Sequence, residues 1–181
     1  MTRIPHDARQ DLRVVWIALD RHSPAWQRLT QHYPGGIISH RSAARMHQTD
    51  DIDADVLEFT CRRRVRINLR DVRIHSGEME RDGWTIVDGL PVTSARRTVA
   101  DLTAAGIDGG HLATVVRDAL SRELVSAPEL EKTLATFAFR YGHPPGDGRE
   151  FLDSLIAQAG VSVNTLFLAD AYRRATGAGA D

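Results

Sequence analysis

The chain has 181 residues, of which 42% are hydrophobic and 26% charged, and its formal net charge at pH 7 is -1. This composition is typical of a globular protein with one ordinary core, and it argues against a protein that coats nucleic acid through overall charge. The sequence has no apolar run near the ~20 residues that span a bilayer, so we expect a cytoplasmic protein without a membrane partner. Its one cysteine, Cys61, excludes an intramolecular disulfide, and we expect a small strand residue there rather than a reactive thiol.

Helical patterns dominate the first 48 residues. From Asp7 to His22, apolar residues recur at three- and four-residue steps, which predicts an amphipathic helix with one buried face. A second, short helix is expected from Pro24, with Ser23 as its N-cap, to about residue 32. Ser39 is a favoured N-cap residue and predicts a third helix over residues 40–48, whose alanines would allow close packing against a sheet.

The middle of the chain has the alternation of β-strands. Acids at positions 50, 51, 53 and 55 predict a turn, which a strand over residues 56–61 follows. Alternation in two pieces from Val65 to Ile74 predicts half-buried strands with one cationic face. Trp84 to Val92 supplies the last extended segments, with a turn signal at Asp88-Gly89.

The remainder of the chain has helical patterns. Ser94 is expected to cap a helix over residues 95–105, and further helices are expected over 112–124, 129–141, 150–159 and 164–175. We therefore predict an α/β (α+β) protein: a small mixed, mostly antiparallel sheet flanked by the 40–48 and 95–105 helices, with a helical C-terminal half. The expected divisions are an N-terminal helical segment (1–35), an α/β core (36–106), a helical region packed on that core (107–175) and a flexible tail (176–181).

A local concentration of positive charge lies between Cys61 and His75. Six arginines, at positions 62, 63, 64, 66, 70 and 73, face a single acid, Asp71. Three interpretations are open. The strand around Glu58 could pair antiparallel with that around Arg66 and neutralise the arginines, the arginines could form an interface for an acidic protein, or they could contact a phosphate backbone.

We find no pattern that predicts an enzyme, and we expect no catalytic residue, metal site or cofactor. His40 and His47 would lie roughly 10 Å apart on one helix, too far to share a metal ion, and the other histidines show no zinc-ligand spacing. The glycine-rich segments lack the ending of a P-loop, and the acids of residues 50–58 lack the EF-hand pattern. Lys132 is the only lysine, and no Asp…Glu-x-Lys nuclease triad can be assembled around it.

Several short motifs follow one another between Gly36 and Leu102. They are residues 39–44 with His47, Phe59-Thr60, the arginines 62–64, residues 72–75, residues 87–94, Arg97-Thr98 and Asp101-Leu102. In this order the chain resembles the AbiEi-type antitoxins of actinobacterial type IV toxin-antitoxin systems. A weaker similarity extends to residues 11–20 and to parts of residues 109–142.

The resemblance implies an antitoxin that neutralises a nucleotidyltransferase-like AbiEii toxin and contributes to autoregulation of its operon. Members of this family usually carry an N-terminal winged helix that binds operator DNA, and this chain starts near the end of the linker that follows it. We therefore expect that module to lie outside this sequence. The alternative function is a DNA-binding transcriptional regulator acting on its own promoter, and an enzyme of unrecognised type is a third hypothesis.

The expected partners are the cognate toxin and, as further candidates, operator DNA and a second copy of the chain. Residues that could contact the toxin or DNA are polar or cationic and lie in the motifs above or beside them. They are Ser39, His40, Arg41, Arg45, Arg62, Arg63, Arg64, Arg66, Arg70, Arg73, Arg96 and Arg97.

Overall fold

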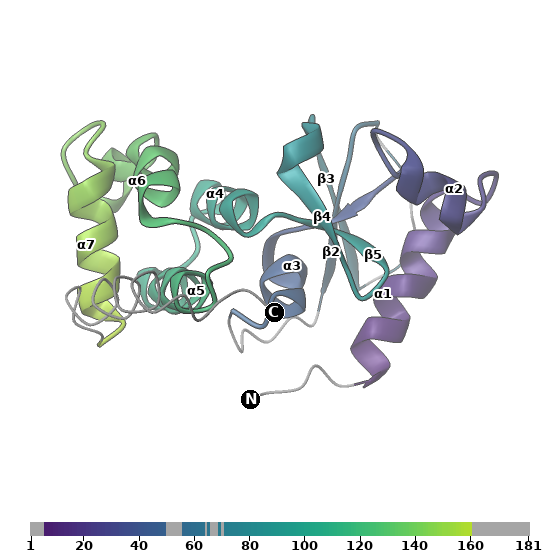
Figure 1. Cartoon of the computed structure of the whole chain (residues 1–181), viewed down its shortest axis with the longest axis horizontal. Helices are drawn as coiled ribbons and strands as arrows, with labels where there is room; N and C mark the ends of the chain where they lie inside the picture. Colours follow the sequence, from purple (N-terminus) through teal and green to yellow (C-terminus); the bar gives the residue numbers. More distant parts are fainter. Residues whose placement is uncertain (1–5, 50–55, 64, 66–68, 70, 161–181) are drawn as a thin grey trace, which may run out of the picture.

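The computed structural model describes residues 6–49, 56–63, 65, 69 and 71–160, and the side chains from residue 9 onward within these ranges. The described part of the chain forms seven α-helices, two short 3-10 helices and one five-stranded sheet. In Figure 1 the sheet lies between α1 (His6–Leu19) and α2 (Ala25–Thr30) on one side and α3 (His40–Met46) on the other. The remaining described helices form a separate group beyond α4 (Ala95–Ala105). None of the described helices is long and apolar enough to cross a bilayer.

The two predicted N-terminal helices are confirmed as α1 (His6–Leu19) and α2 (Ala25–Thr30). The apolar face of α1 packs on the sheet and buries Leu12, Val15 and Trp16. The indole Nε1 of Trp16 donates a hydrogen bond of 3.0 Å to the backbone oxygen of Gly36, which joins α1 to the start of the sheet. The N-cap of α2 is Pro24, one residue later than expected.

The sheet contains β1 (Ile37–Ile38), β2 (Leu57–Cys61), β3 (Val72–Ser76), β4 (Trp84–Val87) and β5 (Leu90–Thr93) in the spatial order β3-β2-β1-β5-β4. The pairs β1/β2 and β4/β5 are antiparallel, whereas β1/β5 and β2/β3 are parallel. The predicted α/β fold with a mixed sheet is therefore confirmed, and its pairings divide evenly instead of being mostly antiparallel.

The strand predicted to begin at Val65 is wrong at its described positions. Val65 and Leu69 belong to no strand, and Leu69 is 50% exposed. Because β2 and β3 run parallel, the chain must return from the end of one to the start of the other, and the intervening residues serve as this connection. Glu58 faces Arg73 of β3 in the parallel register, whereas the antiparallel pairing was expected with a strand around Arg66, which lies outside the described residues. The 50–55 turn and arginines 64, 66 and 70 lie outside the described residues.

The expected turn at Asp88-Gly89 joins β4 and β5. Both residues have positive φ, +51° and +75°, as a two-residue type I′ hairpin turn requires. The predicted helix after Ser94 is confirmed as α4 (Ala95–Ala105), and the Ser94 hydroxyl accepts a hydrogen bond of 3.4 Å from the Arg97 N–H.

The helical half continues through α5 (Gly109–Ser121), α6 (Ala127–Ala135) and α7 (Gly148–Gln158), with α4 joining it to the sheet. Its core is built from residues such as Val99, Leu102, Leu112, Leu130 and Phe151, all at most 1% exposed. The helix predicted over 129–141 is divided into α6 and a 3-10 helix, Ala138–Tyr141. A second 3-10 helix, Arg81–Gly83, precedes β4, and the helix predicted over 164–175 lies outside the described residues.

Candidate functional site around His40 and His75

One face of β2 and β3 is polar and largely hidden from solvent. The alternation of these strands directs Phe59 into the apolar core below α1 and places Glu58 and Thr60 on the opposite face. Glu58 and Thr60 are only 5% and 3% exposed. Buried ionisable groups are uncommon unless other polar groups satisfy them, and they gather at functional sites. This face is therefore the starting point of the candidate site.

The Glu58 carboxylate holds the start of α3 (His40–Met46). Its Oε2 accepts a hydrogen bond of 3.0 Å from the Arg41 N–H, and its Oε1 lies 3.1 Å from His75 Nε2 and 3.7 Å from Arg73 Nη1. Ser39 occupies the N-cap position, as expected, but its side chain makes no capping bond, and Glu58 supplies one instead. Burial alone would raise the pKa of Glu58. The hydrogen bonds from His75 and Arg41, together with the electrostatic effect of His40 and His75, outweigh burial and bring the pKa of Glu58 below its usual value.

His40 adopts a backbone conformation that is rare for a residue with a side chain. Its φ is +52°, and its ring stacks on that of His75 with the centroids 3.6 Å apart and an interplanar angle of 14°. Such left-handed conformations cost about 1–3 kcal/mol, and they collect at functional sites. The His40 Nδ1 lies 3.0 Å from the Ser39 hydroxyl. Burial is the main cause that lowers the His40 pKa, and the neighbouring His75 acts in the same direction.

The helix α4 contributes an ion pair to the same place. Arg97 Nε donates a hydrogen bond of 2.7 Å to Asp101 Oδ1, and Asp101 is 8% exposed. The second carboxylate oxygen, Oδ2, is buried and has no hydrogen-bond partner among the described residues. The Arg97 side chain is 32% exposed, and its Nη1 reaches only the Glu78 carbonyl, at 3.5 Å. The guanidinium therefore keeps hydrogen-bonding capacity for a partner.

We call these residues the histidine cluster. It comprises Ser39, His40, Glu58, Thr60, His75, Arg97 and Asp101.

The structure brings only part of the predicted contact set to the histidine cluster. Ser39, His40 and Arg97 belong to it, and Arg41 and Arg73 touch it through Glu58.

The other described candidates lie elsewhere or point to solvent. Arg62 pairs with Glu78 at 3.0 Å, and Arg96 pairs with Asp82 at 3.4 Å. Within the described part of the chain, the side chains of Arg41, Arg45 and Arg63 form no ion pair. Arg41 and Arg63 are exposed. The predicted contact residues did not include four members of the cluster: Glu58, Thr60, His75 and Asp101. The signal that could have found three of them is the strand alternation, which places Glu58 and Thr60 on the same face as His75.

The one hydroxyl–imidazole pair of the cluster is not accessible to a substrate. The Ser39 hydroxyl lies near His40, but Ser39 is fully buried, and its Oγ accepts a hydrogen bond of 2.9 Å from Thr60 Oγ1. No group of three or more His, Cys, Asp or Glu residues in the described part of the chain is arranged to hold a metal ion. What the cluster offers is a set of partly exposed cationic and imidazole groups fixed on a buried carboxylate.

No protein-family model matches this chain, and no curated protein is significantly similar to it.

Proposed function

We propose that the chain is an antitoxin that neutralises a nucleotidyltransferase-type toxin and acts without catalysing a reaction of its own. One observation carries the proposal. The motifs on which the resemblance to AbiEi-type antitoxins rests are separated in sequence, yet residues from five of them come together in the histidine cluster. Thr60 bonds to Ser39, the His40 ring stacks on His75, and the Arg97–Asp101 pair is close enough to act electrostatically on His40. Motifs that only stabilised the fold would have no reason to share one polar, strained centre.

The charge at the rim of the cluster is consistent with a protein partner. The Arg73 side chain is 64% exposed, Arg41 is exposed, and Arg97 keeps one side of its guanidinium unpaired. The buried Glu58 fixes the backbone of Arg41 and the side chain of His75 from below, so these groups are held in place before any partner arrives. Preorganised cations of this kind favour an acidic surface on the partner.

The alternative function, direct control of a promoter, has less support. Four of the seven residues of α3, including Ala43 and Met46, are buried against the sheet and α4, so this helix cannot enter a DNA groove as it stands. A contribution to autoregulation would use exposed arginines on phosphates. Such binding would weaken steeply as salt rises, and an unshifted promoter fragment at low salt would remove this alternative.

Co-expression with a nucleotidyltransferase-type toxin of the AbiEii kind tests the main proposal. We expect cells that induce the toxin to resume growth when the chain is also induced. Undiminished toxicity in cells that contain soluble chain would contradict the proposal.

A further inference from the structure

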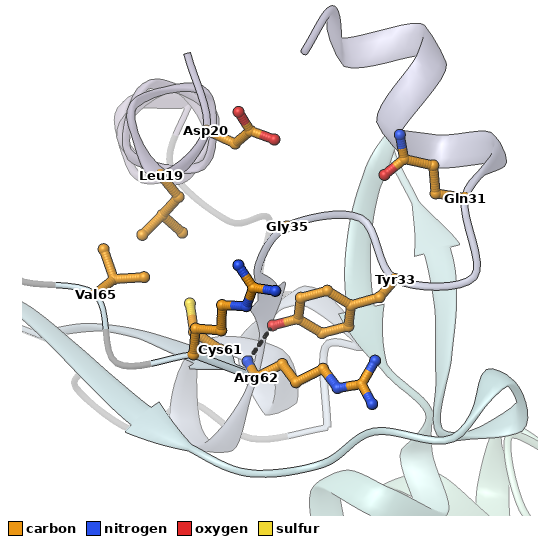
Figure 2. A pocket seen from close by; sticks show the side chains of 9 residues that line it. Leu19, Asp20, Gln31, Tyr33, Gly35, Cys61, Arg62 and Val65 are labelled. Carbon is orange, nitrogen blue, oxygen red and sulfur yellow. Dashed lines mark hydrogen bonds between the residues drawn. The ribbon is translucent and has the colours of Figure 1, made fainter. Parts of the chain in front are cut away.

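A pocket of about 500 Å³ opens on the side of the molecule where α1, the segment after α2 and the end of β2 meet. Figure 2 shows the side chains around it. Its lining residues come from three separate segments and combine charged, polar and apolar groups. They are Leu19, Asp20, Gln31, Tyr33, Gly35, Cys61, Arg62, Arg63 and Val65. Its volume lies within the ~300–1,000 Å³ of common ligand sites.

A buried cation lies directly behind this lining. Arg28 is 1% exposed, and its guanidinium lies 4.0 Å from the ring centroid of Trp16. Its Nε donates to the Pro34 carbonyl at 2.9 Å, and its Nη1 donates to the carbonyls of Trp16 and Asp20. The third nitrogen, Nη2, is buried and has no hydrogen-bond partner in the described part of the chain. No carboxylate of the described residues forms an ion pair with Arg28, although the Asp20 charge acts on its guanidinium.

Gly35 brings this charge close to the pocket. It lines the pocket with φ at +79°, and a Cβ built on it would lie 3.3 Å from both Nε and Nη2 of Arg28. Asp20, Tyr33 and Cys61, which also line the pocket, interact electrostatically with the same guanidinium. Burial lowers the pKa of Arg28, but an arginine stays protonated in proteins. The pocket therefore has a fixed positive charge behind its floor.

Two further arginines stand at the rim. Arg63 is exposed and has no ion pair among the described residues, and Arg62 pairs with Glu78 through side chains that are 58% and 75% exposed. An ion pair so open to solvent is worth little, so Arg62 can exchange Glu78 for another carboxylate. The Arg62 N–H donates to the Tyr33 hydroxyl at 2.7 Å, which fixes the backbone at the rim (Figure 2). Of the nine lining residues, only Asp20 is acidic.

We propose that this pocket binds a carboxylate side chain from an acidic segment of a protein partner. Guanidinium groups pair with carboxylates through two parallel hydrogen bonds, and both Arg62 and Arg63 can do so here. The apolar side chains of Leu19 and Val65 can contact the methylene groups of an inserted Asp or Glu. The choice of a protein as partner rests on the proposed antitoxin function.

The test is a titration of the 15N-labelled full chain, followed by NMR, with a capped hexaglutamate peptide. We expect shifts of the amides of Gly35, Arg62 and Arg63, and about tenfold weaker binding by the Arg63→Glu variant. The matched control is Arg149→Glu, which reverses an exposed arginine on α7 and should bind like the unaltered chain.

Two further arms identify the source of the anion. A hexathymidylate oligonucleotide at the same charge concentration should cause smaller shifts, and sodium chloride at equal ionic strength should cause none at these amides. The inference is contradicted if hexaglutamate shifts none of these amides, if the oligonucleotide binds as well or better, or if both arginine variants bind alike. The titration contains no toxin, so its outcome is independent of the co-expression experiment. If the chain binds the peptide but does not rescue cells, the antitoxin proposal is overturned and the pocket proposal stands.

Discussion

The rings of His40 and His75 stack at 3.6 Å although the residues lie on different elements, one at the start of α3 and the other on an edge strand of the sheet. The positive φ of His40 is the local strain that accompanies this contact. Glu58 lies beside both residues, because it bonds to His75 and to the N–H that follows His40. A single buried carboxylate thus ties together two elements that the sequence keeps far apart.

Replacing Glu58 by Ala should destabilise the fold by about 3 kcal/mol, since the Arg41 N–H and the His75 ring lose their partner. Urea unfolding at pH 7.5 measures this change. Glu80→Ala, at an exposed position, should change the free energy of unfolding by no more than ~0.5 kcal/mol. A Glu58 variant as stable as the Glu80 variant would show that the carboxylate does not hold α3 in place.

From the lowered pKa of Glu58 we expect the folded chain to lose stability in acid. Its pKa in the folded chain is below the ordinary 4.5, so it adds stability that is fully present above pH 4.5 and is lost as the pH falls through the folded-state value. The Glu58→Ala variant should therefore show a smaller loss between pH 5 and pH 3 than the unaltered chain. An identical loss in both proteins would contradict the lowered pKa.

Two histidines lead us to expect a second loss of folding stability, which begins at a higher pH. Burial lowers the pKa of His40 and His47 below the ordinary 6.5, so the unfolded chain binds more protons than the folded chain as the pH falls below 6.5. Stability is fully present above that pH and should decrease toward the folded-state pKa values. His47→Gln should lose less between pH 7 and pH 5.5, because Gln can still donate to the Thr93 carbonyl and does not titrate. Equal losses of stability in His47→Gln and in the control His22→Gln, which changes an exposed histidine, would contradict a contribution of His47 to the pH dependence.

Close approach of α6 and α7 makes Gly148 irreplaceable. A Cβ at this position would meet the backbone oxygen of Glu131 and the backbone nitrogen of Ala135, neither of which can move alone. Gly148→Ala should cost more than ~3 kcal/mol by thermal or urea unfolding. Gly109→Ala is a matched control at another helix start, where the nearest atom is 3.4 Å away at the flexible end of Gln158. It should be neutral or slightly stabilising, and similar losses in both variants would contradict the packing argument.

Local patterns were sufficient to predict most elements. The periodicity of residues 7–22, the turn at Asp88-Gly89 and the cap at Ser94 each act within a few residues, and each is confirmed. The strand expected from Val65 was wrong at its described positions, Val65 and Leu69, because alternation alone does not report whether a segment pairs with a neighbouring strand. The histidine cluster was only partly predicted, since its members meet through tertiary packing. Burial of Glu58 depends on the register of β2 and β3, which no local pattern specifies.

The most direct test of the central claim compares two neighbouring arginines in cells that induce the toxin. Arg97→Lys keeps a positive charge beside Asp101 but loses the planar guanidinium that we propose contacts the toxin. Arg96→Lys makes the same change at a residue that pairs with Asp82 outside the cluster. Colony counts should fall at least about tenfold with Arg97→Lys and stay unchanged with Arg96→Lys, at equal amounts of soluble chain. Full rescue by both variants, or no rescue by the unaltered chain, would contradict the account.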